Sequence, residues 1–169
     1  MPIQRLNHAV LYVRDVERSA EFYQAMLGFR PVRSFPGRAV FLQAAASTND
    51  HDLGLFQIGG QAGDSAAGRE AVGLYHLAWE VDTLAELDRI AKELTRVGAL
   101  VGSSDHGTTK ALYARDPDGL EFEVSWLVPA DLLTEEARSV IGALPLDLPA
   151  EIARYGAETP GGIGVSVPL

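Results

Sequence analysis

The sequence contains no cysteine, which excludes disulfide bonds and thiolate metal sites. It also has no block of basic residues, and its net charge is −9, so nucleic acid and anionic membranes are not expected partners. No apolar run approaches the roughly 20 residues that a membrane-spanning helix needs. The first residues enter a strand-like alternation at once, which predicts no secretion signal. These absences predict a soluble cytoplasmic protein.

The sequence contains enough apolar residues to form a packed interior. Hydrophobic residues make up 47% of the 169 residues, which suits one domain or two small modules that share a core. Residues 5–13 alternate as a strand, an apolar helical stripe follows, and three more strands are predicted up to residue 58. The same order recurs from residue 74 to residue 128, and Asp15 and Asp82 are the expected N-caps of the two helices.

Matching residues mark this repeat. His8 and His76 each lie five residues before the end of the first predicted strand of a series, and Gly28 and Gly98 each follow a predicted helix. We therefore expect an α+β fold of two pseudo-symmetric βαβββ modules, whose mixed sheets form a cleft or half-barrel. The expected parts are a first module at residues 1–58, a Gly-, Ala- and Ser-rich linker at 59–73, a second module at 74–128, and a C-terminal arm at 129–169, with a helix over 129–144 and a shorter one over 149–155.

Residues 110–126, KALYARDPDGLEFEVSW, are typical of a β-hairpin. The turn is Asp116-Pro117-Asp118-Gly119, because proline presets φ at its second position and glycine tolerates a left-handed conformation at its fourth. With this turn, residues whose numbers add up to 236 face each other across the two strands. Tyr113 then lies opposite Glu123, on the less apolar face of the sheet.

Three side chains of this pattern are candidate metal ligands. His8 and His76 lie at matching positions of the repeat, on the face away from the predicted helices, and Glu123 lies on the same kind of face. If the two sheets curl towards each other, two imidazoles and one carboxylate converge and leave coordination sites open. Such a set suits Fe(II), Mn(II) or another divalent cation. The alternative is that both histidines are structural, which their equivalent positions disfavour.

Several segments resemble the vicinal oxygen chelate superfamily, which includes glyoxalases, bleomycin-resistance proteins and extradiol dioxygenases. LNHAVLYVRDVERSAEFYQAMLGF is similar to the start of its first module, and GLYHLAWEV to the start of its second. DHGTTKALYARDPDGLEFEVSW resembles the closing hairpin of the extradiol catechol dioxygenase branch. The resemblance covers about residues 5–128 and leaves the arm unaccounted for.

The resemblance implies roles for individual residues. His8, His76 and Glu123 would be the metal ligands, and Tyr113 would hydrogen-bond a substrate oxygen. His106 would face the pocket and move protons, unless it is a solvent-exposed loop histidine. It also implies a homodimer.

Four further positions matter for the site. Gln57 is expected near the place of Glu123 in the first module, where glyoxalase I carries a fourth ligand, usually Glu. Because an amide is a weak donor, we favour an open site with three ligands. His51 is expected to be a strand-edge residue. Phe41 and Tyr12 are candidates to line a substrate pocket.

The leading functional hypothesis is an extradiol ring-cleaving dioxygenase that uses Fe(II) and O2 on a catechol-like aromatic. One alternative is a glyoxalase-type isomerase, lyase or thiol transferase, which would use Mn(II), Ni(II) or Zn(II). Another is a binding protein for a drug or metabolite, although such proteins generally lack the ligand triad. Oxygen consumption with iron distinguishes the first hypothesis from the others.

Overall fold

The computed structural model describes residues 2, 3, 5–68 and 70–166. Contacts divide the chain into two compact units, which are described separately below. The first comprises the chain up to residue 66 together with the turn 116–120, and the second comprises the remainder. The last three residues of the predicted arm and Arg69 of the predicted linker lie outside the described residues. In the part of the chain that the structure describes, no helix is long and apolar enough to cross a bilayer.

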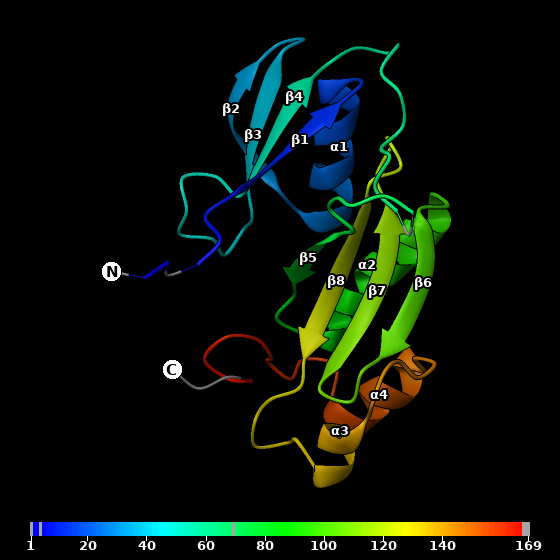
Figure 1. Cartoon of the computed structure of the whole chain (residues 1–169). Coiled ribbons are helices and arrows are strands. Elements are labelled where there is room, and N and C mark those ends of the chain that lie inside the picture. Colours follow the sequence, from blue (N-terminus) through cyan, green and yellow to red (C-terminus); the bar gives the residue numbers. More distant parts are fainter. Residues whose placement is uncertain (1, 4, 69, 167–169) are drawn as a thin grey trace. The chain divides into compact units, whose positions relative to one another are not determined.

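The first unit is a four-stranded mixed sheet with one helix against it (Figure 1). Its strand order is β1-β4-β3-β2, in which β1 and β4 are parallel and the other pairs are antiparallel. Its elements are β1 (Ala9–Val13), α1 (Val16–Leu27), β2 (Arg30–Phe35), β3 (Ala39–Gln43) and β4 (Leu53–Gln57).

Helix α1 begins and ends where its sequence predicts. The side chain of Asp15 accepts a hydrogen bond from the backbone N–H of Arg18, and Gly28 ends the helix in a left-handed conformation with φ 70°. Tyr23 on the buried face of α1 is 2% exposed. Its hydroxyl donates to Asp116 Oδ2 at 3.2 Å, so the turn 116–120 packs as part of this unit.

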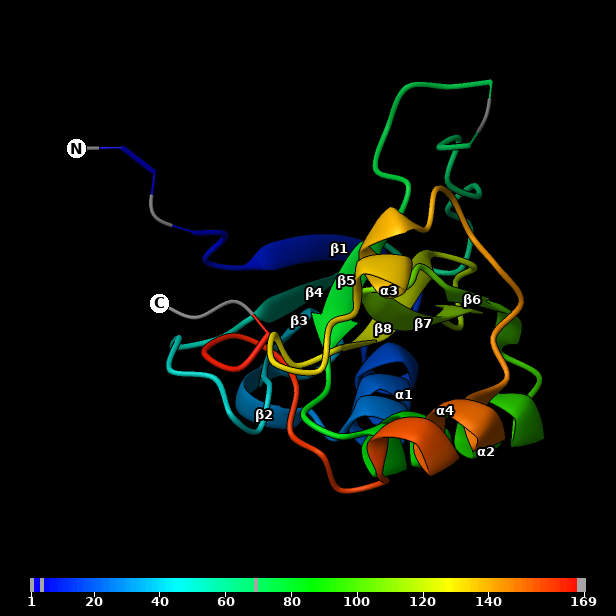
Figure 2. The same cartoon turned by 90° about the horizontal axis from the view of Figure 1, so that it is seen from below.

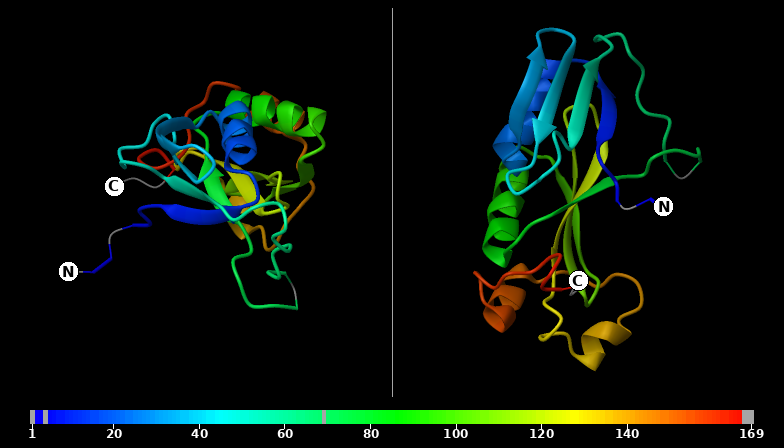
Figure 3. Two further views of the ribbon diagram at one scale, coloured as in Figure 1. Left: turned by 90° about the horizontal axis from the view of Figure 1, so that it is seen from above. Right: turned by 90° about the vertical axis from the view of Figure 1, so that its left-hand side faces the viewer.

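The second unit repeats the arrangement of the first. Its strand order is β5-β8-β7-β6, with β5 and β8 parallel and the other pairs antiparallel, so each module has the same topology. In Figure 3, helix α1 lies against one face of the first sheet, and the corresponding helix of the second unit, residues 84–96, lies against one face of the second sheet. The elements of the second unit are β5 (Leu77–Glu80), α2 (Leu84–Arg96), β6 (Leu100–Asp105), β7 (Thr109–Arg115), β8 (Glu121–Leu127), α3 (Glu135–Ser139) and α4 (Leu148–Tyr155). The prediction of two βαβββ modules is therefore confirmed.

The predicted hairpin is also confirmed, including its register. Each paired residue of β7 and β8 follows the predicted sum of 236, and Tyr113 lies opposite Glu123. Gly119 has φ 82°, and its N–H donates to the carbonyl of Asp116 at 3.0 Å. Local turn chemistry therefore determines which side chains of the second sheet share a face.

Two predictions about helices were wrong. Thr83, not Asp82, caps α2, because the Thr83 hydroxyl accepts from the backbone N–H of Glu86 at 3.2 Å. The helix predicted over residues 129–144 is limited to α3, with Thr134 as its N-cap. The backbone is already extended at Val140, so the chain beyond it leaves the helix. Helix α4 forms close to the predicted position and lies beside α2 (Figure 2).

Candidate functional site

The face of the second sheet that is turned away from α2 carries three of the candidate residues. His76 immediately precedes β5, and Glu123 and Tyr113 face each other on β8 and β7. Glu123 also pairs with Ala78 of β5, two residues after His76. Side chains two residues apart on a strand share a face, so His76, Glu123 and Tyr113 lie on the same side of the sheet.

His76 and Glu123 lie at a distance that suits two ligands of one ion. Nε2 of His76 is 3.3 Å from Oε2 of Glu123. Adjacent donors in an octahedral site with bonds of about 2.1 Å lie about 3 Å apart. The Nδ1 atom of His76 is buried without a hydrogen-bond partner among the described residues. The spacing of Nε2 of His76 and Oε2 of Glu123 therefore fits two donors to one divalent metal ion.

The carboxylate of Glu123 is oriented by a neighbour on its own strand. The hydroxyl of Ser125 donates to Oε1 of Glu123 at 2.8 Å. The other oxygen, Oε2, is thereby directed to His76. Hydrogen bonds of this kind fix the orientation of ligating carboxylates in metal sites. No feature of the sequence alone singled out Ser125.

Tyr113 and His106 form a hydrogen-bonded pair beside these two residues. Nε2 of His106 is 2.9 Å from the hydroxyl of Tyr113, and Nδ1 is 3.0 Å from the carbonyl oxygen of Gly142. The ring of Tyr113 lies 6.0 Å from the ring of His76, centroid to centroid. His106 is half-buried in this arrangement and is not a freely exposed loop histidine.

The environment of Tyr113 keeps its hydroxyl protonated. Partial burial raises the pKa of Tyr113, and the nearby carboxylate of Glu123 raises it further. A hydrogen bond with Ser104 acts in the opposite direction without reversing the shift. At neutral pH, Tyr113 is therefore a neutral phenol that can donate one hydrogen bond and accept another.

The third predicted ligand, His8, belongs to the first unit, where it immediately precedes β1. Its ring stacks at 4.4 Å, between centroids, on the ring of His51, and its Nδ1 is 2.7 Å from the side-chain oxygen of Asn7. Nδ1 of His51 lies 3.1 Å from Asp50, which lowers the pKa of that carboxyl group. His51 is thus not simply a residue at a strand edge, because it lies before β4 and contacts His8.

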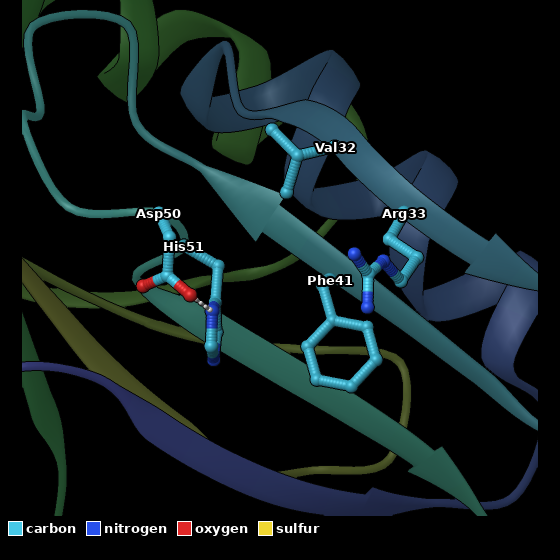
Figure 4. Close-up of a pocket in the computed structure, with 5 residues that line it drawn as sticks. All are labelled: Val32, Arg33, Phe41, Asp50 and His51. Carbon is cyan, nitrogen blue, oxygen red and sulfur yellow. Dashed lines mark ion pairs between the residues drawn. The ribbon is translucent and has the colours of Figure 1, made fainter.

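A pocket of about 260 Å³ lies next to His51 in the first unit (Figure 4). Its lining residues are Val32, Arg33, Phe41, Asp50 and His51. Phe41 packs edge-on against His51 with a centroid distance of 5.1 Å and also lines a second pocket beside Phe56. Tyr12, the other predicted lining residue, is 71% exposed and lines neither pocket.

The repeat equates Glu123 with Gly54, not with Gln57. Glu123 pairs with Ala78, two residues after His76, and Gly54 pairs with Val10, two residues after His8. Gln57 lies three residues further along, on the face that packs against α1. Its side-chain oxygen accepts a hydrogen bond from the backbone N–H of Val16 at 3.1 Å. The alignment of Gln57 with Glu123 was therefore wrong, and the equivalent position has no side chain.

The structure thus brings together His76, Glu123, Tyr113 and His106 in one unit and places His8 in the other. Among the described residues of either unit, no group of three or more His, Asp or Glu side chains is arranged to hold a metal ion. A ligand triad with His8 accordingly stays a prediction. Sequence reasoning missed Ser125, Gly142 and Gly54, of which only Gly54 could have been found, by aligning the two modules on strand pairing.

Comparisons with known proteins agree with this architecture. The family model described as "Glyoxalase/Bleomycin resistance protein/Dioxygenase superfamily" matches residues 5–124. A solved structure from Frankia sp. EAN1pec, a glyoxylase/bleomycin resistance protein/dioxygenase domain, has a TM-score of 0.59 at 23% identity and covers 75% of this chain and 100% of its own. This likeness concerns the fold.

Two curated relatives carry different activities in their names. Catechol-2,3-dioxygenase of Bacillus subtilis is 29% identical over 119 residues, which are 70% of this chain but only 40% of that enzyme. Lactoylglutathione lyase of Neisseria meningitidis is 29% identical over 133 residues, 70% of this chain and 88% of that protein. Identity at this level supports the superfamily without selecting one reaction. From the extent of the family match and the repeated module topology, the chain belongs to the glyoxalase/bleomycin resistance protein/dioxygenase superfamily.

Proposed function

We propose that this protein is a metal-dependent, extradiol-type ring-cleaving dioxygenase that acts on a catechol-like aromatic substrate. The observation that carries the proposal is the glycine at position 54, which is equivalent to Glu123 by strand pairing and supplies no fourth ligand. With His8, His76 and Glu123 as ligands, the site has two imidazoles and one carboxylate. Open positions beside such a set are typical of non-haem Fe(II) oxygenases.

The metal is proposed to be Fe(II), with Mn(II), Ni(II) or Zn(II) as alternatives. When bound, Fe(II) supplies the redox chemistry by which both atoms of O2 enter the catechol and its ring opens beside the two hydroxyls. His8, His76 and Glu123 would hold the ion, and Ser125 would keep the Glu123 carboxylate in orientation.

Tyr113 and His106 provide the proton path. The Tyr113 oxygen accepts a proton from a substrate hydroxyl while its own proton passes to Nε2 of His106, 2.9 Å away. Because its pKa is raised, Tyr113 does not remain ionised at neutral pH and relays the proton instead of keeping it. Nε2 of His106 is therefore the proposed acceptor for one catechol proton.

The first unit offers a place for the substrate ring. Phe41 presents an aromatic edge to a pocket of about 260 Å³, and His51 connects that pocket to the ring of His8. A small pocket with an aromatic wall favours a compact planar ligand. A substrate of this shape agrees with a catechol.

A glyoxalase-type isomerase or lyase is the second candidate. It is favoured by the match to lactoylglutathione lyase, which spans 88% of that relative, whereas the match to the dioxygenase spans 40%. Such an enzyme would use the same ligands to stabilise an enediolate and would consume no oxygen. The absence of a carboxylate at position 54 disfavours it.

The deciding experiment is metal analysis of anaerobically purified protein, followed by a panel of catechols with an oxygen electrode. We expect about one bound iron per chain and one O2 consumed per catechol opened. Turnover with Ni(II) or Zn(II) and no oxygen uptake would select the second candidate. Ligand binding with no turnover under any metal would indicate a binding protein. Light scattering on the same sample tests the implied homodimer.

Two variants of strand β8 test the ligand assignment. Glu123→Gln removes a charged donor, so metal content and oxygen uptake should both be lost. Glu121→Gln is a matched control, because Glu121 lies two residues away and forms an exposed ion pair with Arg115 at 2.8 Å. If Glu123→Gln and His76→Ala keep full metal occupancy, the ligand assignment is wrong.

A further inference from the structure

The C-terminal arm, defined here as residues 129–166, packs in space against the end of strand β6 and the start of β7. Leu144 and Asp105 exchange two backbone hydrogen bonds, both at 2.9 Å. A Cβ atom on Gly107 would lie 2.0 Å from the carbonyl oxygen of Ala137 in α3, so the two segments approach closely there. All of these contacts lie within the second unit. The arm is therefore packed along the loop that carries His106 (Figure 1).

Within this contact, both ring nitrogens of His106 have partners. A carbonyl oxygen accepts hydrogen bonds and cannot donate them, so the 3.0 Å contact between Gly142 O and Nδ1 requires a proton on Nδ1. In the neutral imidazole, Nε2 is then unprotonated and accepts. The Tyr113 hydroxyl, 2.9 Å away, must donate to it. The arm thus determines the direction of the hydrogen bond between Tyr113 and His106.

We propose that Gly142 is a positioning residue, whose carbonyl holds His106 in the Nδ1–H tautomer and thereby makes Nε2 the proton acceptor for Tyr113. The inference rests on the proposed function for its consequence in catalysis, but the tautomer itself does not depend on metal or substrate. With the proton on Nε2 instead, His106 would donate to the Tyr113 oxygen and could not take its proton. The arm, which lies beyond the segment matched by the family model, is then part of the proton path.

The backbone at position 142 explains why the arm has glycine there. Gly142 has φ 87°, a left-handed conformation that L-amino acids rarely adopt. A Cβ atom at this position would meet no heavy atom within 4 Å, so substitution strains the backbone without a side-chain clash. Gly142→Ala should therefore turn the carbonyl away from Nδ1 while leaving the surrounding packing in place. Ile141 is 96% exposed, which makes Ile141→Ala a matched control.

The test is a long-range 1H–15N correlation spectrum of the full-length, metal-free chain labelled with 15N-histidine. The signals of His106 are identified by their loss in His106→Gln. We expect neutral His106 to carry its proton on Nδ1 in the wild type and in Ile141→Ala, and to shift towards the Nε2–H form in Gly142→Ala. A wild-type His106 protonated on Nε2, or an unchanged tautomer in Gly142→Ala, would overturn the proposal.

Leu144→Pro is a second variant for the case in which Gly142→Ala does not fold. It removes the hydrogen bond from Leu144 N–H to Asp105 O and should loosen the same contact, with the same shift in tautomer. Oxygen uptake then separates the two proposals. If catechols are cleaved, Gly142→Ala should lower kcat by at least about tenfold, since general acid–base catalysis contributes about 10²–10⁴-fold. If the tautomer is as expected but no oxygen is consumed, the proposed function fails and the positioning role of Gly142 stands.

Discussion

The two oxygens of the Glu123 carboxylate have different neighbours. Oε1 accepts from the Ser125 hydroxyl, and Oε2 faces His76. A carboxylate held in this way does not have to rotate when an ion binds, so less conformational entropy is lost. We therefore expect Ser125 to act on metal affinity without being a ligand.

For Ser125→Ala we expect metal affinity to fall by about 10–100-fold, because the carboxylate loses the hydrogen bond that fixes it. The measurement is competition with a chelator of known affinity. Ser103→Ala is the control, since Ser103 is exposed on β6. Equal affinities in the two variants would contradict an orienting role for Ser125.

Asp116 couples the stability of the first unit to pH. Its Oδ1 accepts from the backbone N–H groups of Asp118 and Leu120, both at 2.9 Å, and its Oδ2 accepts from Tyr23. Burial raises the pKa of Asp116 despite these hydrogen bonds. The folded state therefore binds this proton more tightly than the unfolded chain. Its contribution to stability is complete below the unfolded pKa and is lost as pH rises through the raised folded pKa.

Asp116→Asn should remove this contribution. Relative to the variant, the wild type should gain stability as pH falls from about 7 towards about 4. Urea unfolding at a series of pH values measures the difference, with the exposed Asp131→Asn as control for the loss of a carboxylate. Parallel pH profiles for the wild type and Asp116→Asn would show that the proton on Asp116 is not linked to folding.

At the scale of elements, strand pairing determines how the two modules correspond. The histidine that precedes β1 and the histidine that precedes β5 are equivalent, and so are Gly54 on β4 and Glu123 on β8. A Cβ atom on Gly54 would lie 3.5 Å from Val10 and 3.6 Å from Phe41, which are ordinary contact distances. Position 54 can therefore accommodate a Cβ atom, so steric crowding does not explain why the residue there is glycine.

Gly54→Glu should install a fourth donor on the face of the sheet that carries His8. We expect metal affinity to rise by about tenfold or more with the added charge, and oxygen uptake to be lost as an open position is filled. Gly54→Ala is the matched control, because it adds the Cβ atom without a carboxylate and should keep both properties. Undiminished oxygen uptake in Gly54→Glu would argue against an equivalence of Gly54 and Glu123 at the metal.

The same elements show which parts of the fold local sequence can predict. The register of β7 and β8 followed from Asp116-Pro117-Asp118-Gly119, because a tight turn fixes strand pairing. The place of Gln57 did not follow, because the loop before β4 is longer than the turn before β8 and sequence order alone does not give the pairing. The cap of α2 was missed by one residue, since Asp82 and Thr83 are both good N-cap residues.

On the scale of the whole chain, the arm was the least predictable part. Its role depends on backbone contacts between residues distant in sequence, such as Gly142 with His106 and Leu144 with Asp105, and such contacts leave no periodic signal. Sequence reasoning named His76, Glu123, Tyr113 and His106, which the structure brings together in the second unit, whereas a ligand role for His8 stays a prediction. The parts of the site in which a backbone carbonyl or a serine hydroxyl orients another side chain, as Gly142 does for His106 and Ser125 for Glu123, could not be predicted from the sequence.

Lys110 joins the arm to the second sheet. Its ammonium lies 2.5 Å from Asp105 and 2.9 Å from Glu151 of α4, its side chain is 1% exposed, and it sits over the ring of Tyr155. Removal of a buried cation leaves its carboxylate partners uncompensated, which costs about 3–5 kcal/mol. Here the carboxylates keep some contact with solvent, so the lower end of that range applies.

Lys110→Met should therefore lower the free energy of unfolding by about 3 kcal/mol in chemical denaturation. Lys92→Met is the matched control, because Lys92 pairs with Asp88 one helical turn away and is 74% exposed. Its loss should change stability by less than about 1 kcal/mol. Similar losses in the two variants would mean that Lys110 does not anchor the arm.

The contact between the arm and strand β8 also provides an intrinsic optical probe. Trp126, one of two tryptophans in the chain, is fully buried, its indole N–H donates to the carbonyl of Thr159 at 3.2 Å, and its ring lies 5.5 Å from that of Tyr155. Detachment of the arm would expose this indole to water and shift its fluorescence emission to longer wavelength. Docking of the arm can therefore be followed in real time in the unlabelled protein, independently of turnover.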